Sequence, residues 1–193
     1  MLQGQGSSLP IDQLEIIVKL FGRSNKKIYK RHLRWTDDFV KNNIYNIEKN
    51  YSLYPTRNRW NCNCHVIHDN DIDVNPIDYN FLRKEYERLT MDVSRKYGMK
   101  KYSLSDIWYN YYKEGQYQEA HDHEGNGGLT AVHYLIFDSK YHSPTLFDDP
   151  TIKSPKVKRG DIIFFPDSWM HYVPRNETNK PRLTVAFTIT SGE

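Results

Sequence analysis

The chain has 193 residues and a formal net charge of +3, with 38% hydrophobic and 26% charged residues. This length allows one sizeable core, and the small net charge gives no reason to expect strong nucleic-acid binding. No apolar run reaches the length of a membrane span and no secretory signal is visible, so we expect no membrane association. The two cysteines, Cys62 and Cys64, give no disulfide framework, which favours a reducing, cytoplasmic compartment.

The first hundred residues begin with two predicted strands. Residues 15–20 read as a short strand, with a helix as the alternative. Residues 26–34 carry five positive charges. We interpret them as the solvated face of a strand, because a nucleic-acid patch would need a larger and more clustered excess of charge.

Two helices are predicted next. Residues 36–38, Thr-Asp-Asp, cap a helix that runs to about Asn50. A second helix is predicted over residues 76–97, and Gly98 ends it. The apolar candidates of the second helix are Phe81, Leu82, Tyr86, Leu89, Met91 and Val93.

Residues 60–68 contain two cysteines and two histidines within a short stretch. A structural zinc site draws its ligand pairs from separated segments, whereas these four residues are crowded into seven positions. We therefore prefer a strand with two small buried thiols over a zinc site.

The remaining chain is predicted to form a barrel of short strands separated by turns. The strands are expected at residues 103–113, 118–123, 129–138, 145–147, 161–165, 170–173 and 182–190. No internal repeat or long linker is visible. We expect one domain over residues 1–193, in which residues 1–100 support a core at 101–193 that carries the site.

Three histidines stand at spacings that suit a metal ion. Successive side chains of a strand point to opposite faces, so His121 and His123 share a face that Asp122 does not. His171 follows the apolar run 162–165, which reads as a buried strand ending in a turn. If that strand lies across the barrel from His121, three imidazoles can hold one divalent ion and leave positions open for substrate and oxygen.

An arginine and a threonine form a second candidate feature. Arg182 and Thr184 are two residues apart on a predicted strand, so their side chains share a face. A guanidinium suits a carboxylate, and a threonine hydroxyl can add one hydrogen bond. The turn over residues 174–181 brings this strand back beside His171. We therefore expect a socket for a small dicarboxylate next to the metal.

Residues 104–190 resemble the double-stranded β-helix core of the 2-oxoglutarate- and Fe(II)-dependent oxygenases. The resemblance rests on His121 and His123, on the distal His171, and on Arg182 and Thr184, which begin eleven residues after His171. This combination is far more specific than any one of its parts.

Further stretches extend the resemblance over roughly the C-terminal half of the chain. Asn110, Tyr112 and Gly115 resemble the strand that touches 2-oxoglutarate in the nucleic-acid-repair branch. Residues 128–135 and 160–171 resemble core strands of phage- and bacteria-borne members. The whole is similar to a prolyl-hydroxylase-like member of the superfamily.

The chain departs from the superfamily at one ligand position. The usual pair is a histidine followed two residues later by an aspartate or glutamate, whereas this chain has His121 and His123. The site is either a three-histidine variant or one that draws on Asp122 or Glu124. The choice between them bears on the charge and reactivity of the metal rather than on the fold.

The resemblance implies a fold, cofactors and a reaction. The fold is mainly β with flanking helices and a double-stranded β-helix core of the jelly-roll, cupin-like kind. The three histidines are the catalytic and metal-binding residues for Fe(II), and Arg182 holds 2-oxoglutarate with Thr184, Tyr112 and Asn110. Dioxygen and 2-oxoglutarate are consumed, succinate and carbon dioxide are released, and a second substrate is hydroxylated, with ascorbate as a reductant.

Two other readings remain open at this stage. One is a cupin-type metal protein or enzyme that does not use 2-oxoglutarate, and the other is a metal-free jelly-roll adaptor. Arg182 with Thr184 argues against the first, because a cupin has no need of them. Bound metal would argue against the second. The hydroxylated substrate is not defined by the sequence; a protein or peptide side chain is preferred over a nucleobase or a small metabolite, on resemblance alone.

Other polar and aromatic residues are expected to be structural. His133 and His142 are interpreted as structural histidines, with the cavity as an alternative place for His133. Trp108, Trp169 and Tyr172 can line a substrate cleft, but aromatic residues are common in this chain, so packing is the preferred role.

Overall fold

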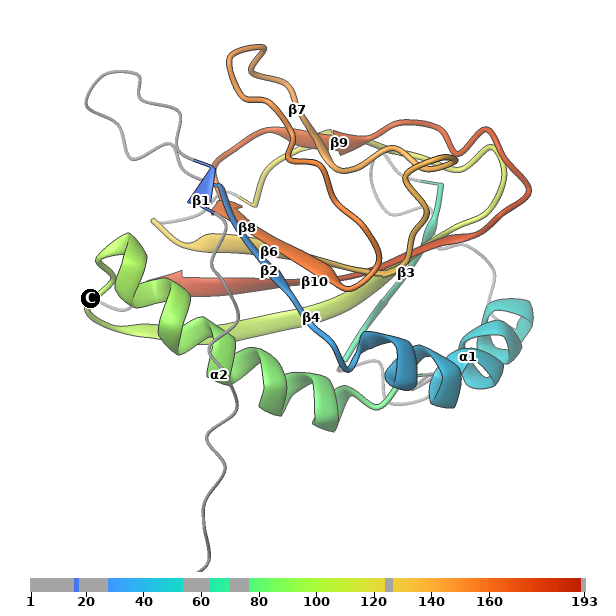
Figure 1. The fold of residues 1–193 in the computed structure, drawn as a ribbon, viewed down its shortest axis with the longest axis horizontal. Helices are drawn as coiled ribbons and strands as arrows, with labels where there is room; N and C mark the ends of the chain where they lie inside the picture. The colour runs from blue at the N-terminus through green and yellow to red at the C-terminus, as the bar shows by residue number, and fades with distance from the viewer. Residues whose placement is uncertain (1–15, 18–27, 54–62, 70–76, 124–126, 192–193) are drawn as a thin grey trace, which may run out of the picture.

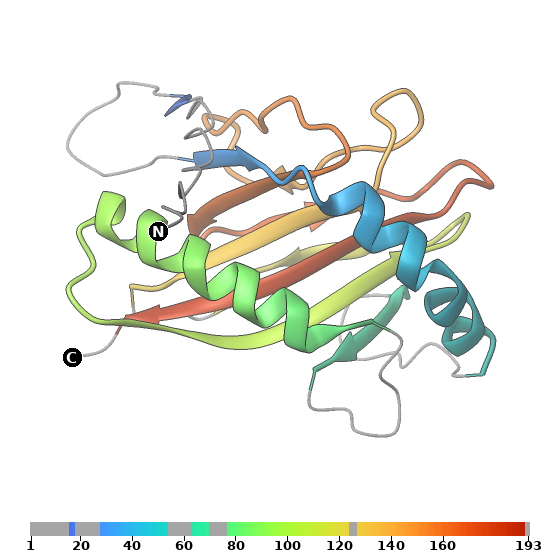
Figure 2. The same ribbon diagram turned by 60° about the horizontal axis from the view of Figure 1, so that its bottom comes forward.

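The computed structural model describes residues 16–17, 28–53, 63–69, 77–123 and 127–191. In this part of the chain a small sheet faces a large sheet, and two helices cover the outer face of the large sheet (Figure 1). Turning the molecule shows one helix running along that face and the other at its end (Figure 2). The predicted mainly β architecture with flanking helices is confirmed.

The large sheet has the strand order β1-β2-β8-β6-β10-β4-β3 among the described residues, and its neighbours pair antiparallel. Its strands are β1 (Ile16–Ile17), β2 (Ile28–His32), β3 (His65–His68), β4 (Tyr102–Tyr112), β6 (Leu129–Ile136), β8 (Asp161–Pro166) and β10 (Arg182–Ser191). The small sheet has the order β5-β9-β7, with β5 (Gln118–His121), β7 (Leu146–Phe147) and β9 (His171–Val173). From β4 to β10 consecutive strands alternate between the two sheets, which is the winding of a double-stranded β-helix.

Side chains of the large sheet alternate between two cores. On β4, β6 and β10 the odd-numbered residues, such as Tyr109 and Val185, join the cluster beneath the helices. Even-numbered residues such as Trp108 and Ala186 join the cluster between the two sheets, except beyond the register shifts, where Tyr102, Leu104 and Ile136 pack against the first cluster. Because a strand has a period of two, a slip of one residue would exchange these sets. The alternation therefore fixes which residues of each strand face the space between the sheets.

The first helix, α1 (Thr36–Leu53), begins where the sequence predicts and continues three residues beyond Asn50. The Thr36 hydroxyl donates to the Leu33 carbonyl at 2.7 Å. Asp37 and Asp38 lie in the first turn, where negative charge is favourable beside the free N–H groups of a helix start.

The second helix, α2 (Tyr79–Tyr97), begins three residues after the predicted start and ends where Gly98 predicts. The Asp78 side chain accepts from the Phe81 N–H at 3.0 Å, and Gly98 ends the helix with a φ of +76°. Such a φ is costly for residues with a Cβ. One core prediction is wrong: Met91 is 46% exposed, because it lies on the side of the helix that faces away from the sheet. Neither helix is long and apolar enough to cross a membrane, within the residues that the structure describes.

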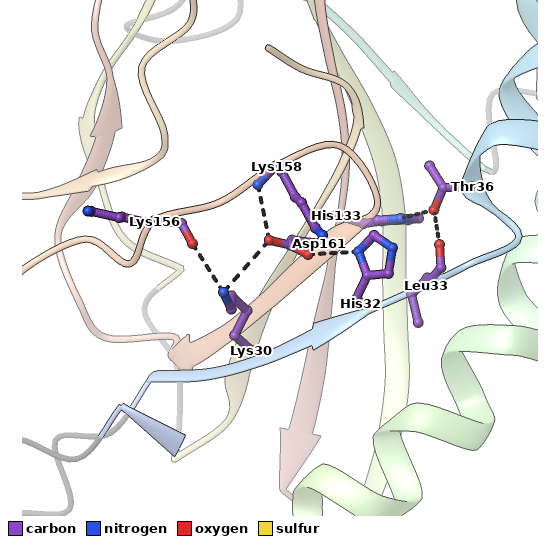
Figure 3. A network of polar contacts seen from close by, with 8 residues as sticks. All are labelled: Lys30, His32, Leu33, Thr36, His133, Lys156, Lys158 and Asp161. Atoms are coloured by element: carbon purple, nitrogen blue, oxygen red, sulfur yellow. Dashed lines mark hydrogen bonds and ion pairs between the residues drawn. The ribbon is translucent and has the colours of Figure 1, made fainter. Parts of the chain in front are cut away.

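The described part of the basic stretch before α1 is a strand, as predicted, but two of its charged side chains are largely covered, whereas Arg34 is exposed and Lys26 and Lys27 lie outside the described residues. The side chains of Lys30 and Arg31 are 17% and 16% exposed. Arg31 pairs with Asp92 of α2, and Lys30 lies 3.8 Å from the Asp161 carboxylate (Figure 3). β2 is enclosed between β1 and β8, so its long side chains pack along neighbours before reaching a partner.

Two further predictions fall partly outside the described residues. The strand predicted over residues 15–20 is described only at Ile16–Ile17, which form β1. Around the cysteines, β3 occupies His65–His68, and Cys64 is buried, whereas Cys62 is not described.

Candidate metal and co-substrate site

A pocket lies between the two sheets and gathers most of the residues singled out from the sequence. It is lined by Trp108, Asn110, Tyr112, Gln118, His121, His123, Thr130, Val132, Thr145, His171, Val173, Arg182, Thr184 and Ala186. The β4, β6 and β10 members are all even-numbered, as the alternation of the large sheet requires. Among these lining residues Arg182 carries the one formal charge at neutral pH, and none of them is acidic.

His121, His123 and His171 form the group of described residues that could hold a metal ion. One ligand atom from each lies within 4.8 Å of the others. The ring centroids of His121 and His171 are 4.3 Å apart, and the His123 centroid is 5.3 Å and 5.2 Å from them. β5 and β9 bring His121 and His171 together, because these two residues are directly paired in the small sheet.

Hydrogen bonds orient two of the rings. His121 Nδ1 lies 2.8 Å from the Glu119 carbonyl oxygen, and His171 Nδ1 lies 2.8 Å from that of Trp169. Since a carbonyl only accepts, both rings carry a proton on Nδ1 and leave Nε2 as a free lone pair. His123 Nε2 is buried without any hydrogen-bond partner. Each of these features suits an imidazole that binds a metal through Nε2.

Burial keeps all three rings uncharged at neutral pH. Desolvation lowers the pKa of His171 to about 3 and that of His123 to about 4, and the neighbouring imidazole of His121 acts in the same direction. The pKa of His121 is also lowered, mainly by burial. A metal ion therefore does not have to displace protons from these side chains near pH 7.

The position of His123 differs from the prediction. β5 ends at His121, with an irregular register, so His123 lies beyond the strand rather than on its face. Its ring still reaches the group, because its backbone N–H donates to the Asp167 carbonyl at 3.1 Å. Asp122 is outside the group, and Glu124 is outside the described residues.

Arg182 is the most unusual side chain of the pocket. It is 2% exposed, and Nε, Nη1 and Nη2 all lack a hydrogen-bond partner. Its guanidinium carbon lies 4.7 Å from the Tyr112 ring centroid and 5.7 Å from that of Tyr134. Ring contacts offset little of the cost of a buried charge, so this guanidinium is suited to bind an anion.

The other residues predicted for the socket lie on the same wall. Thr184 is 1% exposed and shares the pocket face with Arg182. Asn110 has a buried amide oxygen without a partner. The Tyr112 hydroxyl donates to the Gln118 side chain at 2.9 Å, and burial raises the pKa of this phenol, so it stays protonated.

Some lining residues were missed in the sequence. Thr130 is fully buried, and its hydroxyl has no hydrogen-bond partner in the described structure. Ala186 is two residues beyond Thr184, so the alternation that paired Arg182 with Thr184 also predicts its place. Thr130 and Val132 have the same spacing on β6, but the sequence contains no signal that places β6 beside β10.

The histidines interpreted as structural are outside the pocket. His133 lies 2.9 Å from the Thr36 hydroxyl and 2.8 Å from that of Tyr86, beneath the helices. His142 accepts from the Asp138 N–H and lies 3.2 Å from the Lys180 carbonyl. Of the three aromatic residues considered for a cleft, Trp108 lines the pocket, whereas Trp169 and Tyr172 do not.

Comparison with solved structures identifies the class of fold. It is the double-stranded β-helix of the 2-oxoglutarate- and Fe(II)-dependent oxygenases, and prolyl-hydroxylase-like members are among the similar structures. No protein-family model matches the chain, and no curated protein matches its sequence. The likeness is therefore one of three-dimensional structure.

Three of these structures illustrate the likeness. The viral collagen prolyl hydroxylase vCPH of Paramecium bursaria Chlorella virus-1, a 2-oxoglutarate complex, has a TM-score of 0.61 and 20% identity over 86% of this chain and 97% of its own. A Pseudomonas putida prolyl-4-hydroxylase has a TM-score of 0.60 and 12% identity over 87% and 95%. HygX of Streptomyces hygroscopicus, with nickel and 2-oxoglutarate bound, has a TM-score of 0.62 and 14% identity over 87% and 86%. The fold implied by the sequence resemblance is confirmed.

Proposed function

We propose that this chain is a 2-oxoglutarate- and Fe(II)-dependent dioxygenase that hydroxylates a second substrate and converts 2-oxoglutarate to succinate. The observation that carries the proposal is the buried, unpaired guanidinium of Arg182 in one pocket with three neutral histidines. An isolated buried charge costs several kcal/mol, and a bound carboxylate removes that cost. A dicarboxylate with a keto group beside one carboxylate can satisfy the arginine at one end and a metal at the other.

His121, His123 and His171 would hold the metal. The donor set fits, because three neutral imidazoles with their lone pairs free are ligands for divalent iron and leave coordination positions for other molecules. When bound, iron and 2-oxoglutarate supply the oxidising chemistry. The chain binds and orients them, and its apolar lining residues Val132, Val173 and Ala186 keep water out of the space around them.

Arg182 would bind the far carboxylate of 2-oxoglutarate through its planar fork. Thr184 offers a hydroxyl on the same face, and the Tyr112 ring packs against the guanidinium and limits its movement. Asn110 and Tyr112 complete the wall between β4 and β10, two strands that pair directly at this point. These four residues position the co-substrate rather than take part in bond making.

For the second substrate we propose a protein or peptide side chain. The support comes from vCPH and the Pseudomonas putida enzyme, which are named as prolyl hydroxylases and align over 97% and 95% of their own lengths. A turnover assay with proline-containing peptides tests this class directly. Hydroxylation of a nucleobase or a small metabolite in place of every peptide would contradict it.

A cupin-type metal protein without 2-oxoglutarate is the second candidate. Three histidines can form a metal site by themselves, so the donor set does not require an organic co-substrate. Arg182 argues against it, since such a protein has no use for a buried unpaired cation beside the metal. The metal-free adaptor is disfavoured by the three converging imidazoles.

We also propose a reducing, cytoplasmic compartment. The support is that the two cysteines of the chain, Cys62 and Cys64, give no disulfide framework. Thiol titration of the unfolded chain, isolated without reductant, should find both cysteines reduced. A disulfide between Cys62 and Cys64 would contradict this placement.

The experiment that tests the proposed reaction measures succinate. The purified protein is supplied with Fe(II), ascorbate, 2-oxoglutarate and dioxygen, and succinate release is followed with and without peptide. We expect release that requires iron and disappears in His171→Ala. A protein that binds iron but never consumes 2-oxoglutarate would support the cupin alternative instead.

A further inference from the structure

Asp167 is a buried carboxylate outside the proposed ligand set. It lies in the turn between β8 and β9 and is 6% exposed. Backbone N–H groups of Gly128, Ser168 and Asp167 itself donate to the carboxylate. Burial raises its pKa in spite of these bonds. A carboxylate held in this way restrains the backbone segments that it joins.

The Asp167 backbone binds the same two segments. Its carbonyl accepts from the His123 N–H at 3.1 Å, and its N–H donates to the Gly128 carbonyl at 3.2 Å. Asp167 therefore holds the chain at His123 and again at Gly128, five residues later. This matters because β5 has already ended at His121, so no strand pairing fixes His123.

Gly128 is fitted closely to this arrangement. A Cβ built at Gly128 would come within 2.5 Å of an Asp167 carboxylate oxygen and would also collide with the Ile189 carbonyl oxygen. A glycine is needed because the Asp167 side chain and the end of β10 both approach its backbone. The turn also serves His171, whose Nδ1 donates to the Trp169 carbonyl at 2.8 Å.

We propose that Asp167 is a positioning residue that fixes His123 as the third metal ligand. The inference rests on the proposed metal site and adds a residue to it. Asp167 acts through the backbone: its carboxylate locks the turn to Gly128, and its carbonyl sets the position of His123. The turn over residues 167–169 thereby supports two ligands. The Asp167 carbonyl accepts from the backbone N–H of His123, and the Trp169 carbonyl accepts from the ring Nδ1–H of His171. Hydrogen-bonded supports of this kind typically change metal affinity by about 10–100-fold when they are removed.

The test is a double-mutant cycle on metal affinity, with Zn(II) alone as the probe. Asp167→Ala should weaken Zn(II) binding by about 10–100-fold in the otherwise unchanged chain. In a His123→Ala background the same substitution should change the affinity less than about twofold, because the ligand it positions is gone. Asp167→Asn keeps an acceptor oxygen for the Gly128 N–H and should restore part of the affinity. Co(II)-loaded Asp167→Ala should show a visible spectrum shifted toward that of His123→Ala.

Asp161→Asn is the matched control. Asp161 is also buried, and its carboxylate accepts from the Lys158 N–H at 3.0 Å (Figure 3). Its partners His32 and Lys30 lie on β2, and none of these three residues lines the pocket. This variant should lose stability and keep its Zn(II) affinity. Equal losses of affinity from Asp167→Ala in both backgrounds, or no loss in either, would overturn the inference while leaving the metal site intact. An unsubstituted chain that binds no Zn(II) would overturn the proposed metal site together with it.

Discussion

At position 123 the chain places an imidazole where the oxygenases that share its fold usually have a carboxylate. The three proposed ligands are then all neutral, and none of the described residues that line the pocket is acidic. A metal ion in this pocket would keep its full double positive charge beside the cation of Arg182. Such a site favours a dianionic partner, and 2-oxoglutarate carries two negative charges at neutral pH.

Substitution of the histidines separates the ligand roles. His121→Ala and His171→Ala should each abolish tight Fe(II) binding, because each removes one of three protein ligands. His123→Asp should still bind Fe(II), since it restores a charged ligand at that position. Equilibrium titration with Fe(II) under anaerobic conditions measures all three. Unchanged iron stoichiometry in both alanine variants would rule out the triad.

Another residue-scale feature is His133, which is fully buried beneath the helices. The single hydroxyl proton of Thr36 is donated to the Leu33 carbonyl, so its oxygen accepts from His133 Nε2–H. Nδ1 then accepts from the Tyr86 hydroxyl. The ring is uncharged in this arrangement, and burial lowers its pKa to about 3.

The shifted pKa predicts a pH dependence of stability. Between about pH 6.5 and 3 the unfolded chain binds a proton at His133 and the folded chain does not. The free energy of unfolding should therefore fall as the pH is lowered through this window. His133→Gln should be less stable at pH 8, because two buried hydrogen bonds are altered, yet should lose stability less steeply on acidification. Urea unfolding at a series of pH values measures this, and an unchanged slope would contradict it.

At the scale of elements, α2 supports the large sheet from outside the pocket. Leu82, Tyr86 and Val93 lie on its buried side, and the Tyr86 ring stacks on Phe187 of β10 at 4.5 Å between centroids. β10 carries Arg182 and Thr184 on its opposite face. The helix thus braces the strand that forms the socket.

Two substitutions on α2 test this packing. Leu82→Ala should lower the free energy of unfolding by about 2–5 kcal/mol, because it leaves a cavity in a fully buried position. Met91→Ala is the matched control, and we expect a change within about 0.5 kcal/mol because Met91 is on the exposed side. Denaturant midpoints of the two variants give the comparison. Similar losses from both would show that α2 does not pack as described.

Sequence patterns were sufficient for most elements and for part of the site. The residues that start α1, Gly98 at the end of α2 and the alternation of the barrel strands predicted where these elements lie, whereas α2 begins three residues after its predicted start. The spacing of Arg182 and Thr184 predicted that they share a face, because a strand has a fixed period. The place of His123 depends instead on a hydrogen bond to Asp167, a residue 44 positions away in the chain, and no local pattern reports such a bond. The burial of the Lys30 and Arg31 side chains likewise depends on which strands flank β2 in the sheet.

At the scale of the whole molecule, the two halves of the chain share one core. Tyr29, Phe39 and Tyr86 from the first hundred residues lie in the same buried cluster as Leu135 and Phe187. β2 pairs with β8, and β3 pairs with β4, so both ends of the large sheet come from the first half. We propose that residues 1–193 form a single domain.

A single domain predicts one cooperative unfolding transition. Tryptophan fluorescence reports on four tryptophans, among them Trp35 beneath the helices and Trp108 in the pocket, whereas circular dichroism reports on the backbone. The two signals should change at the same denaturant concentration. A core expressed as residues 101–193 should fail to fold, because it lacks both helices and the strands β2 and β3. Two separate transitions would contradict the proposal.

The central claim is that Arg182 anchors the far carboxylate of 2-oxoglutarate beside the metal, and the most direct measurement is the dissociation constant of 2-oxoglutarate from metal-loaded protein. Arg182→Met should raise it by about ten- to a hundredfold, since a hydrogen bond to a charged group contributes about 1.5–3 kcal/mol and each 1.4 kcal/mol is a factor of ten. Lys at this position should restore part of the affinity, and Thr184→Val should cost less, about 1 kcal/mol. The surface variant Arg159→Met should bind as the unsubstituted chain does, and metal affinity should be unchanged in all four. An unchanged dissociation constant in Arg182→Met would contradict the account and leave a metal protein that does not use 2-oxoglutarate.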